Sequence, residues 1–482
     1  MKIAIAYPPL ISDKGAPLLS QNRQFQWFNR PTYIYPVVPA SAATLLARAG
    51  HTVLWMDAIS SRQTERDFVR EVEESRPDLM MIETKTPVVH QTWDWVKALK
   101  RAVPEMKIAL VGDHVTALPE ESMTGCATDY ILTGGDYDFL LKNLVDHLDG
   151  GKGLEHGIWY RDAEGKPQNT GPFRLDHDLN SLPRIDRDLT CWERYSVHNG
   201  NYRRTPGAYV MAGRDCWHGK CTFCSWTTLY PTYRIRTPES VADEIGELIE
   251  KYGVREIMDD TGCFPVGDWL RRFCNILIER GYNRKIYFDC NMRFGALKAE
   301  DYALMKKAGF RFVLFGLESA NQSTLDRVNK KLTVEQIRDG ARMASRAGLD
   351  VHVTVMLGYP WETSAEIERT VTLATELLKR GWAYTLQVTR LIPYPGTPLY
   401  KECDAKDLLV TRTWEDFDMR APVMKTEVPD EEIRCAIRRI YRAFFHPRAL
   451  WNRLLNTRHP LEDARFYARG LLSLMGHLKD FK

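Results

Sequence analysis

The 482-residue sequence has no apolar run that approaches the roughly 18 residues of a membrane-spanning helix. Its opening, MKIAIAYPPL, is too short an apolar segment for a secretory signal, and no small-residue cleavage site follows Pro8 and Pro9. Neither sign of charge dominates, and a net charge of +3 gives no reason to expect a nucleic-acid partner. We therefore expect a cytoplasmic protein, in which a tight group of cysteines indicates a metal more often than a disulfide.

The chain does contain enough apolar material for two or three packed domains, with 44% hydrophobic and 27% charged residues. Residues 1–150 alternate strand-like apolar runs with amphipathic stretches, which predicts a Rossmann-like α/β domain with a parallel sheet between helices. The expected strands are Ile3–Tyr7, Val53–Met56, Leu79–Ile82, Ile108–Val111 and Tyr130–Leu132. Ligands of such sheets bind beyond the carboxyl ends of the strands.

The rest of the chain divides into three segments. Residues 151–204, rich in Gly, Asp, Asn and Pro, are typical of a linker with small hairpins. Residues 205–400 resume the alternation with six strand–helix units, which predicts a partial (β/α)6 TIM barrel. Residues 401–482 are expected to form a helical C-terminal region, in which arginines interleave with apolar residues at helical spacing. Such a helix can lie on a membrane surface, but we favour packing against the protein's own core.

Three cysteines crowd into one loop, GRDCWHGKCTFCSW, at Cys216, Cys221 and Cys224. A tetrahedral zinc site needs a fourth ligand, for which His218 is the candidate. An iron–sulfur cluster can instead use three thiolates and leave one iron open. The spacing alone leaves both interpretations open.

Four further motifs follow expected strands of the second repeat: DDTGCF at 259–264, CNMRF at 290–294, FGLESAN at 315–321 and MLGYPWET at 356–363. Each falls at the carboxyl end of a strand, where parallel barrels build their active sites. A zinc knuckle does not predict this ordered series. Cys263 and Cys290 within these motifs are interpreted as small buried residues, although a place near the barrel mouth would also suit a hydrogen-atom donor.

The cysteine loop and the motif series together resemble the radical S-adenosylmethionine (SAM) superfamily, whose usual spacing is Cys-x3-Cys-x2-Cys with an aromatic residue before the last cysteine. This chain has the aromatic, Phe223, but four residues in the first gap, where Gly219 would help to absorb the extra one. The resemblance implies a [4Fe-4S] cluster on Cys216, Cys221 and Cys224. It implies SAM contacts for Phe223, Asp260, Thr261, Arg293, Glu318 and Ser319.

Within that set the resemblance assigns individual roles. Asp260 and Thr261 are expected near the methionine end of SAM, and Glu318 or Ser319 near its ribose. Arg293 is the candidate partner of the SAM carboxylate, because a guanidinium forms bidentate pairs with carboxylates.

The N-terminal segments YPP, YPVVPASAATLLARAGHTVLWMDA, GDHVTALPEE and TGGD resemble the cobalamin-binding domain that precedes many radical SAM enzymes. That domain is Rossmann-like, of the flavodoxin-like kind. The residues implied at cobalamin are Tyr7, Pro8, Gly112, His114, Thr116, Glu120, Gly134 and Gly135. The Asp-x-His-x-x-Gly spacing that supplies a lower cobalt ligand is absent, since Asp113 and His114 are adjacent, so no histidine is expected to ligate cobalt in the usual way.

Three functions are compatible with these resemblances. The first is cobalamin-dependent methylation of an unactivated carbon, driven by a 5′-deoxyadenosyl radical. The second is oxidative cyclisation or ring contraction of a lipid or tetrapyrrole without methyl transfer, as in relatives with the same two domains. The third, of another class, is a cobalamin or iron–sulfur sensor, which would not need the motifs at the barrel mouth.

The partners of the protein can be predicted only by chemical class. The resemblance implies a small-molecule substrate and an electron donor such as flavodoxin or ferredoxin. Aromatic residues around the cysteine loop, namely Trp217, Phe223, Trp226 and Tyr230, hint at an apolar or planar substrate. The sequence designates no residue as the catalytic acid, base or nucleophile.

Overall fold

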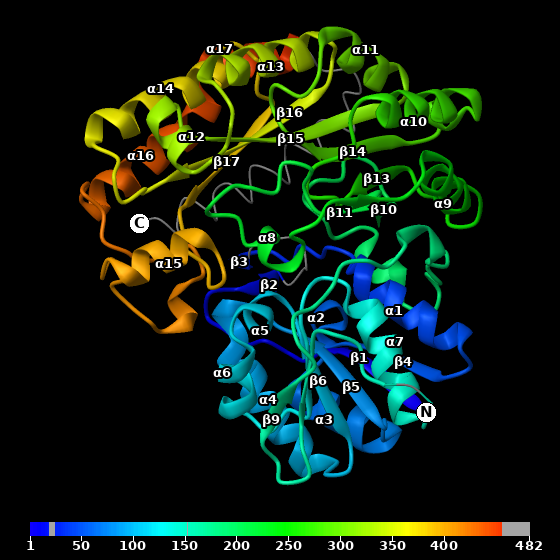
Figure 1. Cartoon of the computed structure of the whole chain (residues 1–482). Coiled ribbons are helices and arrows are strands. Elements are labelled where there is room, and N and C mark those ends of the chain that lie inside the picture. The colour runs from blue at the N-terminus through cyan, green and yellow to red at the C-terminus, as the bar shows by residue number, and fades with distance from the viewer. Residues whose placement is uncertain (19–24, 152, 456–482) are drawn as a thin grey trace.

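The computed structural model describes residues 1–18, 25–151 and 153–455, which form two α/β domains and a C-terminal helical region (Figure 1). The part of the expected helical region beyond residue 455 lies outside the described residues. In Figure 1 the N-terminal domain lies below and the second domain above. Between them lie the hairpins β2–β3 (Ala16–Leu18, Gln26–Phe28) and β11–β12 (Gly213–Arg214, Arg234–Ile235) and helix α8 (Trp226–Leu229).

Five parallel strands form the centre of the N-terminal sheet, in the order β4 (Thr52–Asp57), β1 (Lys2–Tyr7), β5 (Leu79–Glu83), β6 (Lys107–Val111) and β7 (Tyr130–Leu132). Successive β1 side chains alternate between two cores. Ile3 and Ile5 pack with α1 (Val37–Arg48) and α7 (Tyr137–Leu148), whereas Ala4 and Ala6 pack with α3 (Glu65–Ser75) and α4 (Val89–Ala102). This is the doubly wound, flavodoxin-like order, as expected.

The same sheet continues beyond residue 150. Strands β8 (Ile158–Arg161) and β9 (Pro167–Asn169) add an antiparallel hairpin to β7. Short helices α2 (Ala58–Ser61), α5 (Asp113–Ala117) and α6 (Pro119–Gly125) lie after β4 and β6. The expected linker therefore contributes two strands to the first domain.

The second sheet contains six parallel strands in chain order: β10 (Gly207–Val210), β13 (Glu256–Asp259), β14 (Tyr287–Met292), β15 (Phe310–Glu318), β16 (Asp350–Leu357) and β17 (Thr385–Arg390). The connecting helices are α9 (Pro238–Glu250), α10 (Asp268–Glu279), α11 (Ala299–Lys307), α12 (Gln322–Arg327), α13 (Val334–Arg346) and α14 (Ser364–Lys379). Capping boxes begin α13 at Thr333 and α14 at Thr363, as their sequences predict. The predicted partial barrel is thus confirmed.

The amino-terminal side of this barrel is closed by buried charges. Arg311 donates to Glu256 and Asp289, both at 2.7 Å, and lies 3.4 Å from Asp350. A buried arginine between carboxylates is tolerated because each charge has a partner.

The C-terminal region covers the edge of the barrel. Helix α15 (Pro398–Ala405) precedes α16 (Asp430–Arg442) and α17 (Pro447–Leu455), and the buried face of α16 packs on α14 and β17. The Tyr441 hydroxyl bonds to both the N–H and the C=O of Val388, at 3.1 Å each. This helix therefore packs against the protein's own core, as favoured from the sequence.

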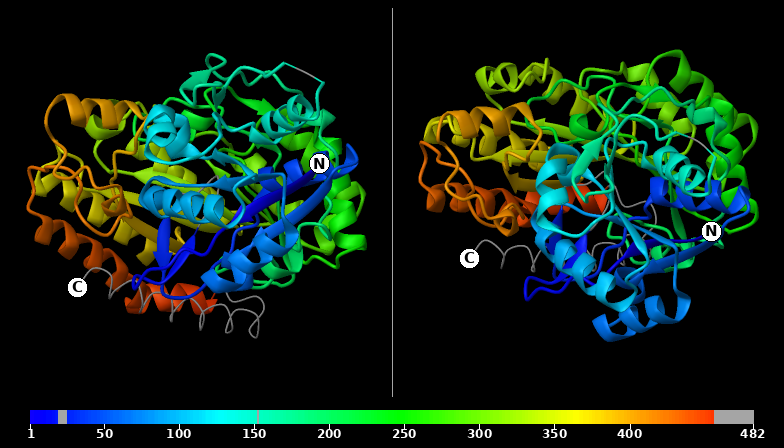
Figure 2. Two further views of the ribbon diagram at one scale, coloured as in Figure 1. Left: turned by 90° about the horizontal axis from the view of Figure 1, so that it is seen from below. Right: turned by 60° about the horizontal axis from the view of Figure 1, so that its bottom comes forward.

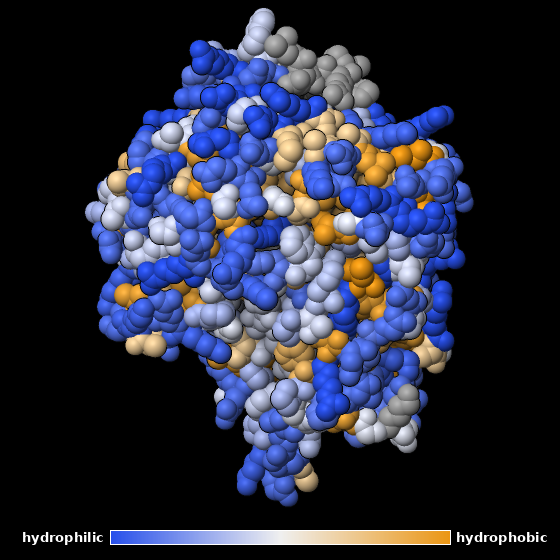
Figure 3. Space-filling view, turned by 45° about the horizontal axis from the view of Figure 1, so that its top comes forward, coloured by the Kyte–Doolittle hydropathy of each residue, from blue (hydrophilic) through white to orange (hydrophobic). Residues whose placement is uncertain are grey.

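The face of the molecule in Figure 3 is mostly hydrophilic, with hydrophobic side chains in separate groups. Within the part of the chain that the structure describes, no helix combines the length and apolarity needed to cross a bilayer. Both views of Figure 2 show the two domains in contact, and α5 of the first domain contacts α8 of the second. The loop after β7 and the hairpin after β10 meet here, since Arg214 of β11 lies 2.8 Å from Asp136.

Candidate active site between the two domains

The three motif cysteines lie in the loop of the β11–β12 hairpin, and all three are half-buried and free. The Cys263 thiol and backbone N–H groups of the loop lower the pKa of Cys216 to about 6, against the effect of burial. Burial raises the pKa of Cys224 to about 12, and the charges of Cys221 and Cys216 add to that effect. The three thiols are therefore close enough to act on one another.

The thiols do not converge as ligands of a single ion would. Among the described residues, no group of three or more His, Cys, Asp or Glu side chains has the geometry of a metal-ion site. The Nε2 atom of His218 lies 2.7 Å from the backbone oxygen of Asn329, so the expected fourth zinc ligand is bound elsewhere. A [4Fe-4S] cluster attaches each thiolate to a different iron, so the thiolates need not meet at one point. The donor set fits a cluster better than zinc.

The backbone of this loop is held by the motif after β13. The Asp259 carboxylate accepts the N–H of Ala212 at 2.7 Å, and the Thr261 hydroxyl accepts the N–H of Gly213 at 2.9 Å. Burial raises the pKa of Asp259 to about 7. Thr261, an expected SAM contact, is thus wholly buried and positions the cysteine loop, while Asp260 beside it is also buried.

Arg293 reaches across the mouth of the barrel to the turn at residues 330–331. Its Nη2 donates to the backbone oxygens of Lys330 and Lys331. Its Nη1 is buried and has no hydrogen-bond partner among the described residues. Burial lowers the pKa of this guanidinium, whereas the neighbouring cysteines, Cys221 first, oppose that effect. A buried donor without a partner beside the thiols fits the expected contact with the SAM carboxylate.

Lys330 belongs to the same site, although the sequence analysis did not select it. Its Nζ lies 2.7 Å from Oε1 of Glu318, and its charge acts on Cys221. Burial by itself would lower the pKa of the Lys330 amine, but Glu318 raises it above its ordinary value. Lys330 lies in a turn with no apolar periodicity, so the NKK cluster after helix α12 was the one local signal in the sequence that could have indicated it.

Ser319 and Phe223 are both buried among protein atoms. The Ser319 hydroxyl donates to Glu362 at 2.6 Å, and Asn321 donates to the same carboxylate at 3.1 Å. Glu362, which the sequence analysis also missed, thereby joins the ends of β15 and β16. Phe223 packs against Met356 in a cluster behind the loop.

In the N-terminal domain, the expected cobalamin residues line the ends of β1 and β6. The Tyr7 hydroxyl donates to Glu83 at 2.7 Å, beside the buried Pro8. Gly112 has φ +123°, and a Cβ there would lie 2.1 Å from the Thr84 oxygen, so this turn requires glycine. His114 is buried, with Nε2 3.2 Å from Glu121. The expectation that His114 does not serve as the usual cobalt ligand stays a prediction.

The TGGD loop after β7 meets the second domain. The Thr116 hydroxyl accepts the N–H of Gly134 at 3.0 Å. A Cβ on Gly134 would lie 2.6 Å from the Phe173 ring, and one on Gly135 would lie 2.0 Å from the Tyr230 ring. These glycines therefore admit aromatic rings of the protein, while Glu120 at the start of α6 is exposed.

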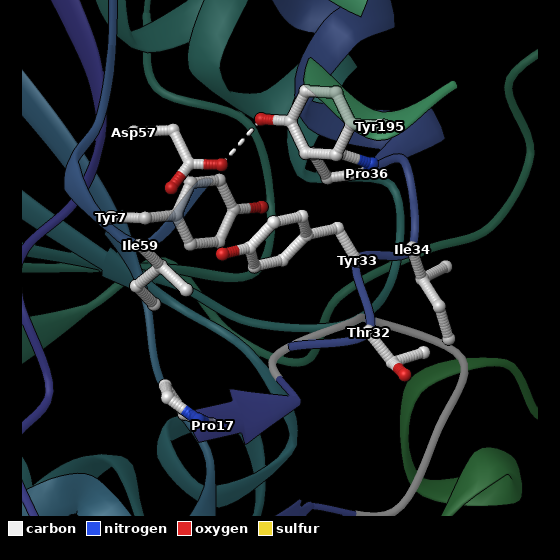
Figure 4. A pocket seen from close by; sticks show the side chains of 9 residues that line it. All are labelled: Tyr7, Pro17, Thr32, Tyr33, Ile34, Pro36, Asp57, Ile59 and Tyr195. Carbon is white, nitrogen blue, oxygen red and sulfur yellow. Dashed lines mark hydrogen bonds between the residues drawn. The ribbon is translucent and has the colours of Figure 1, made fainter. Parts of the chain in front are cut away.

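A small cavity lies at the ends of β1 and β4, where Tyr7, Tyr33 and the hydrogen-bonded pair Asp57 and Tyr195 surround it (Figure 4). Its volume of about 20 Å³ admits a water molecule but no larger ligand. A cofactor of the first domain therefore does not fit here, which leaves the ends of β5 and β6 that face the second domain as the candidate place.

Polar groups that lack partners gather on that side. Among the described residues, buried atoms without a hydrogen-bond partner include Glu83 Oε1, Tyr137 Oη, Trp226 Nε1, Thr228 Oγ1 and Tyr233 Oη. The first two belong to the N-terminal domain and the others to the segment after the cysteines. Buried polar groups are normally paired, so this set fits a large polar ligand between the domains, such as the amide-rich periphery of cobalamin.

Comparison with known proteins agrees with this arrangement. Residues 210–374 match the radical SAM superfamily, and residues 29–138 match the B12 binding domain. The uncharacterized methyltransferase PH0819 of Pyrococcus horikoshii is 28% identical over 407 residues, covering 83% of this chain and 85% of the relative. The anaerobic magnesium-protoporphyrin IX monomethyl ester cyclase of Rubrivivax gelatinosus is 26% identical, covering 86% of this chain and 74% of the relative.

Among solved structures, the cobalamin-dependent SAM radical enzyme OxsB has a TM-score of 0.72 at 13% identity, covering 98% of this chain and 72% of that chain. This likeness concerns the fold. The chain therefore contains a B12 binding domain followed by a radical SAM domain. Its cofactors are a [4Fe-4S] cluster, SAM and cobalamin.

Proposed function

We propose that the protein is a cobalamin-dependent radical SAM enzyme that methylates an unactivated carbon of a small molecule. The observation that supports this most directly is the meeting of the two strand-end sites, where Arg214 beside the cysteine loop donates to Asp136 of the TGGD loop at 2.8 Å. When bound, the cluster with SAM supplies a 5′-deoxyadenosyl radical, and cobalamin supplies the methyl group.

The chain's own residues would hold and orient these groups. Cys216, Cys221 and Cys224 would provide the three thiolates of the cluster, next to the buried cation Lys330. The unpartnered Nη1 of Arg293 would meet the SAM carboxylate, and Glu318 would accept hydrogen bonds from the ribose. Asp260, Thr261, Ser319 and Phe223 would shape the walls around SAM, in keeping with their burial.

The inner face of the barrel offers a polar wall to a substrate. On β16 and β17 the outward side chains are buried, whereas His352, Thr354, Thr385 and Gln387 on the opposite face are half-exposed. Parallel register places Gly316, Thr354 and Gln387 side by side, one layer below Glu318. A substrate there would present hydrogen-bonding groups to this wall and its apolar part elsewhere.

Oxidative cyclisation is the second candidate, favoured by the similarity to the Rubrivivax cyclase over most of both chains. Either reaction needs an electron donor, for which flavodoxin or ferredoxin is the proposed class. A sensor has no use for the SAM-facing residues Arg293 and Glu318, and we place it third.

The deciding experiment uses anaerobically purified, cluster-reconstituted protein with dithionite and SAM, with and without cobalamin. The products 5′-deoxyadenosine and S-adenosylhomocysteine are quantified by mass spectrometry. Methylation predicts both products, with S-adenosylhomocysteine dependent on cobalamin. The appearance of 5′-deoxyadenosine alone would favour cyclisation, and the absence of both products would overturn the enzymatic proposal.

A further inference from the structure

A buried group of charges joins the TGGD loop of the B12 binding domain to the hairpin that carries the cluster cysteines. Arg214 of β11 donates through Nη1 to Asp136 and Asp138, at 2.8 Å each, and through Nη2 to Asp138 at 2.5 Å. Arg234 of β12 forms two bonds to Asp136, at 2.6 and 2.8 Å. Two arginines of one domain thus hold two carboxylates of the other.

These pairs are almost fully withdrawn from water. The exposed fractions of the side chains are 3% for Arg214, 2% for Asp136 and 0% for Asp138. Burial by itself would raise the pKa of Asp136, but Arg214, with His177 and Arg234, holds it well below its ordinary value. Asp136 is therefore charged at neutral pH, and separating it from Arg214 would leave buried charges without partners.

Each end of the charge group is tied to a cofactor loop. Arg214 stands two residues before Cys216, and Asp136 directly follows Gly134 and Gly135. A second contact fixes the register between the loops, because the Gly135 N–H donates to the Leu229 oxygen and the Tyr230 hydroxyl donates to the Gly135 oxygen, each at 3.0 Å. A displacement of the cysteine loop must therefore displace the TGGD loop.

We propose that Arg214, Asp136 and Asp138 are positioning residues that couple the two cofactor sites, so that loading the cluster tightens the binding of cobalamin. Linkage requires the reciprocal effect, in which bound cobalamin raises the affinity of the protein for the cluster by the same factor. This inference rests on the binding of both cofactors to the same chain, and it adds an energetic connection between them. The three residues themselves need touch neither cofactor.

The test compares the dissociation constant of hydroxocobalamin for cluster-free and cluster-loaded protein, measured anaerobically by ultrafiltration and assay of the free corrin. The ratio of the dissociation constant of the cluster-free protein to that of the cluster-loaded protein should be at least about fivefold in the wild type, the lower end of typical coupling between sites. Asp138→Asn keeps the shape of the side chain but removes one charge, and should bring the ratio close to one. Arg214→Lys keeps the positive charge but loses the guanidinium that donates to both carboxylates at once, and it should give an intermediate ratio.

A matched control lies at the other end of the barrel. Glu256→Gln removes one carboxylate from the equally buried Arg311 group, which lies between no cofactor loops. It should lower thermal stability and leave the ratio at the wild-type value, which separates coupling from general destabilisation.

A second measurement needs no variant. The rate at which a chelator removes iron from the wild-type protein should fall several-fold when hydroxocobalamin is added. A ratio of one with measurable cobalamin binding, or a full ratio in Asp138→Asn, would overturn the coupling alone. A failure to bind cobalamin in either state would overturn the proposed function together with this inference.

Discussion

The ion pair between Lys330 and Glu318 depends on a residue that has no side chain. A Cβ on Gly316 would lie 2.0 Å from Oε1 of Glu318 and 2.8 Å from Nζ of Lys330, so a side chain here would displace the charged ends of the pair. Glu318 itself has φ +64°, a left-handed conformation that is costly for a residue with a side chain. The strained backbone of Glu318 thus places its carboxylate at the barrel mouth, beside Lys330.

Lys330→Met tests whether this amine serves SAM. The substitution keeps most of the length of the side chain but removes the charge that pairs with Glu318, so SAM binding should weaken about tenfold or more. Iron content should be unchanged, because Lys330 supplies no ligand. The measurement is the SAM concentration that half-saturates the change in the electron paramagnetic resonance spectrum of the reduced cluster.

Lys331→Met is the matched control, because the neighbouring side chain is exposed. It should bind SAM as the wild type does. Equal SAM binding by Lys330→Met and Lys331→Met would exclude a role for the Lys330 amine.

Sequence reasoning found the residues whose signal is local and missed those whose partners are distant. Motifs at strand ends could be found because the carboxyl ends of all strands in a parallel barrel lie on the same side of the barrel. Lys330 and Glu362 could not, because each acts through a partner on another element, Glu318 in one case and Ser319 in the other. Sequence reasoning predicted Gly134 and Gly135 as cobalamin contacts and missed their contacts with Phe173 and Tyr230, because those rings come from other segments.

At the scale of elements, the cysteine loop is held from outside. The backbone at its first strand donates hydrogen bonds to the side chains of Asp259 and Thr261. Helix α8 is followed by Tyr230, whose hydroxyl donates to the Gly135 oxygen of the TGGD loop. Such a loop can keep its thiols oriented before a cluster arrives, because the hydrogen bonds involve neighbouring elements and not the thiols. The extra residue in the first gap is accommodated where Gly219 adopts φ +54°.

Replacing Cys216, Cys221 and Cys224 together by Ala should abolish the broad iron–sulfur absorption of reconstituted protein. The fold should survive, since the loop's anchors remain. Cys263→Ala is the matched control, because this thiol neighbours Cys216 and should be dispensable for the cluster. Iron and sulfide analysis measures the result. Wild-type iron content in the triple variant would refute the assignment of the ligands.

Gly135→Ala tests the packing between the TGGD loop and Tyr230. The added methyl group would lie 2.0 Å from the ring, so the overpacked interface should cost about 1–3 kcal/mol. In a Tyr230→Ala background the same glycine change should cost less, because the ring that the methyl group would meet is absent. Gly153→Ala, where nothing lies within 4 Å, provides the control.

The readout for this series is urea denaturation. The two changes should be non-additive, since Gly135 and Tyr230 are in direct contact. Additive losses would show that the ring moves aside freely and that the contact is loose.

At the scale of the molecule, two ordinary α/β architectures are joined by an unusual amount of buried charge. The domains themselves could be predicted, because alternating apolar periodicity is repeated along both halves of the chain. Their mutual placement could not, because Asp136 and Asp138 look like helix-capping residues and Arg214 like part of a metal loop until the contact is seen. Interfaces between domains leave little trace in sequence periodicity.

The same interface should make stability depend on pH through His177. Its Nδ1 lies 3.2 Å from Asp136 and its Nε2 3.1 Å from Glu155, while its ring stacks on Phe139 and Arg234 donates to its backbone oxygen. Partial burial lowers the pKa of His177, but the two carboxylates outweigh that effect and raise it.

A raised pKa in the folded protein means that the imidazolium is stabilised by folding. That contribution is fully present below the unfolded value, about 6.5, and is lost as the pH rises through the higher folded value. His177→Gln keeps hydrogen-bonding capacity and removes the titration. The difference in unfolding free energy between wild type and His177→Gln should therefore shrink as the pH rises from about 6 to 9.

Taking this difference matters, because Cys216, Asp215 and Asp259 titrate near the same range and their contributions cancel between the two proteins. Urea denaturation at a series of pH values gives the measurement. A difference that stays constant with pH would mean that His177 is neutral throughout and that Arg214 and Arg234 alone neutralise Asp136. A difference that grows with pH would reverse the assigned sign.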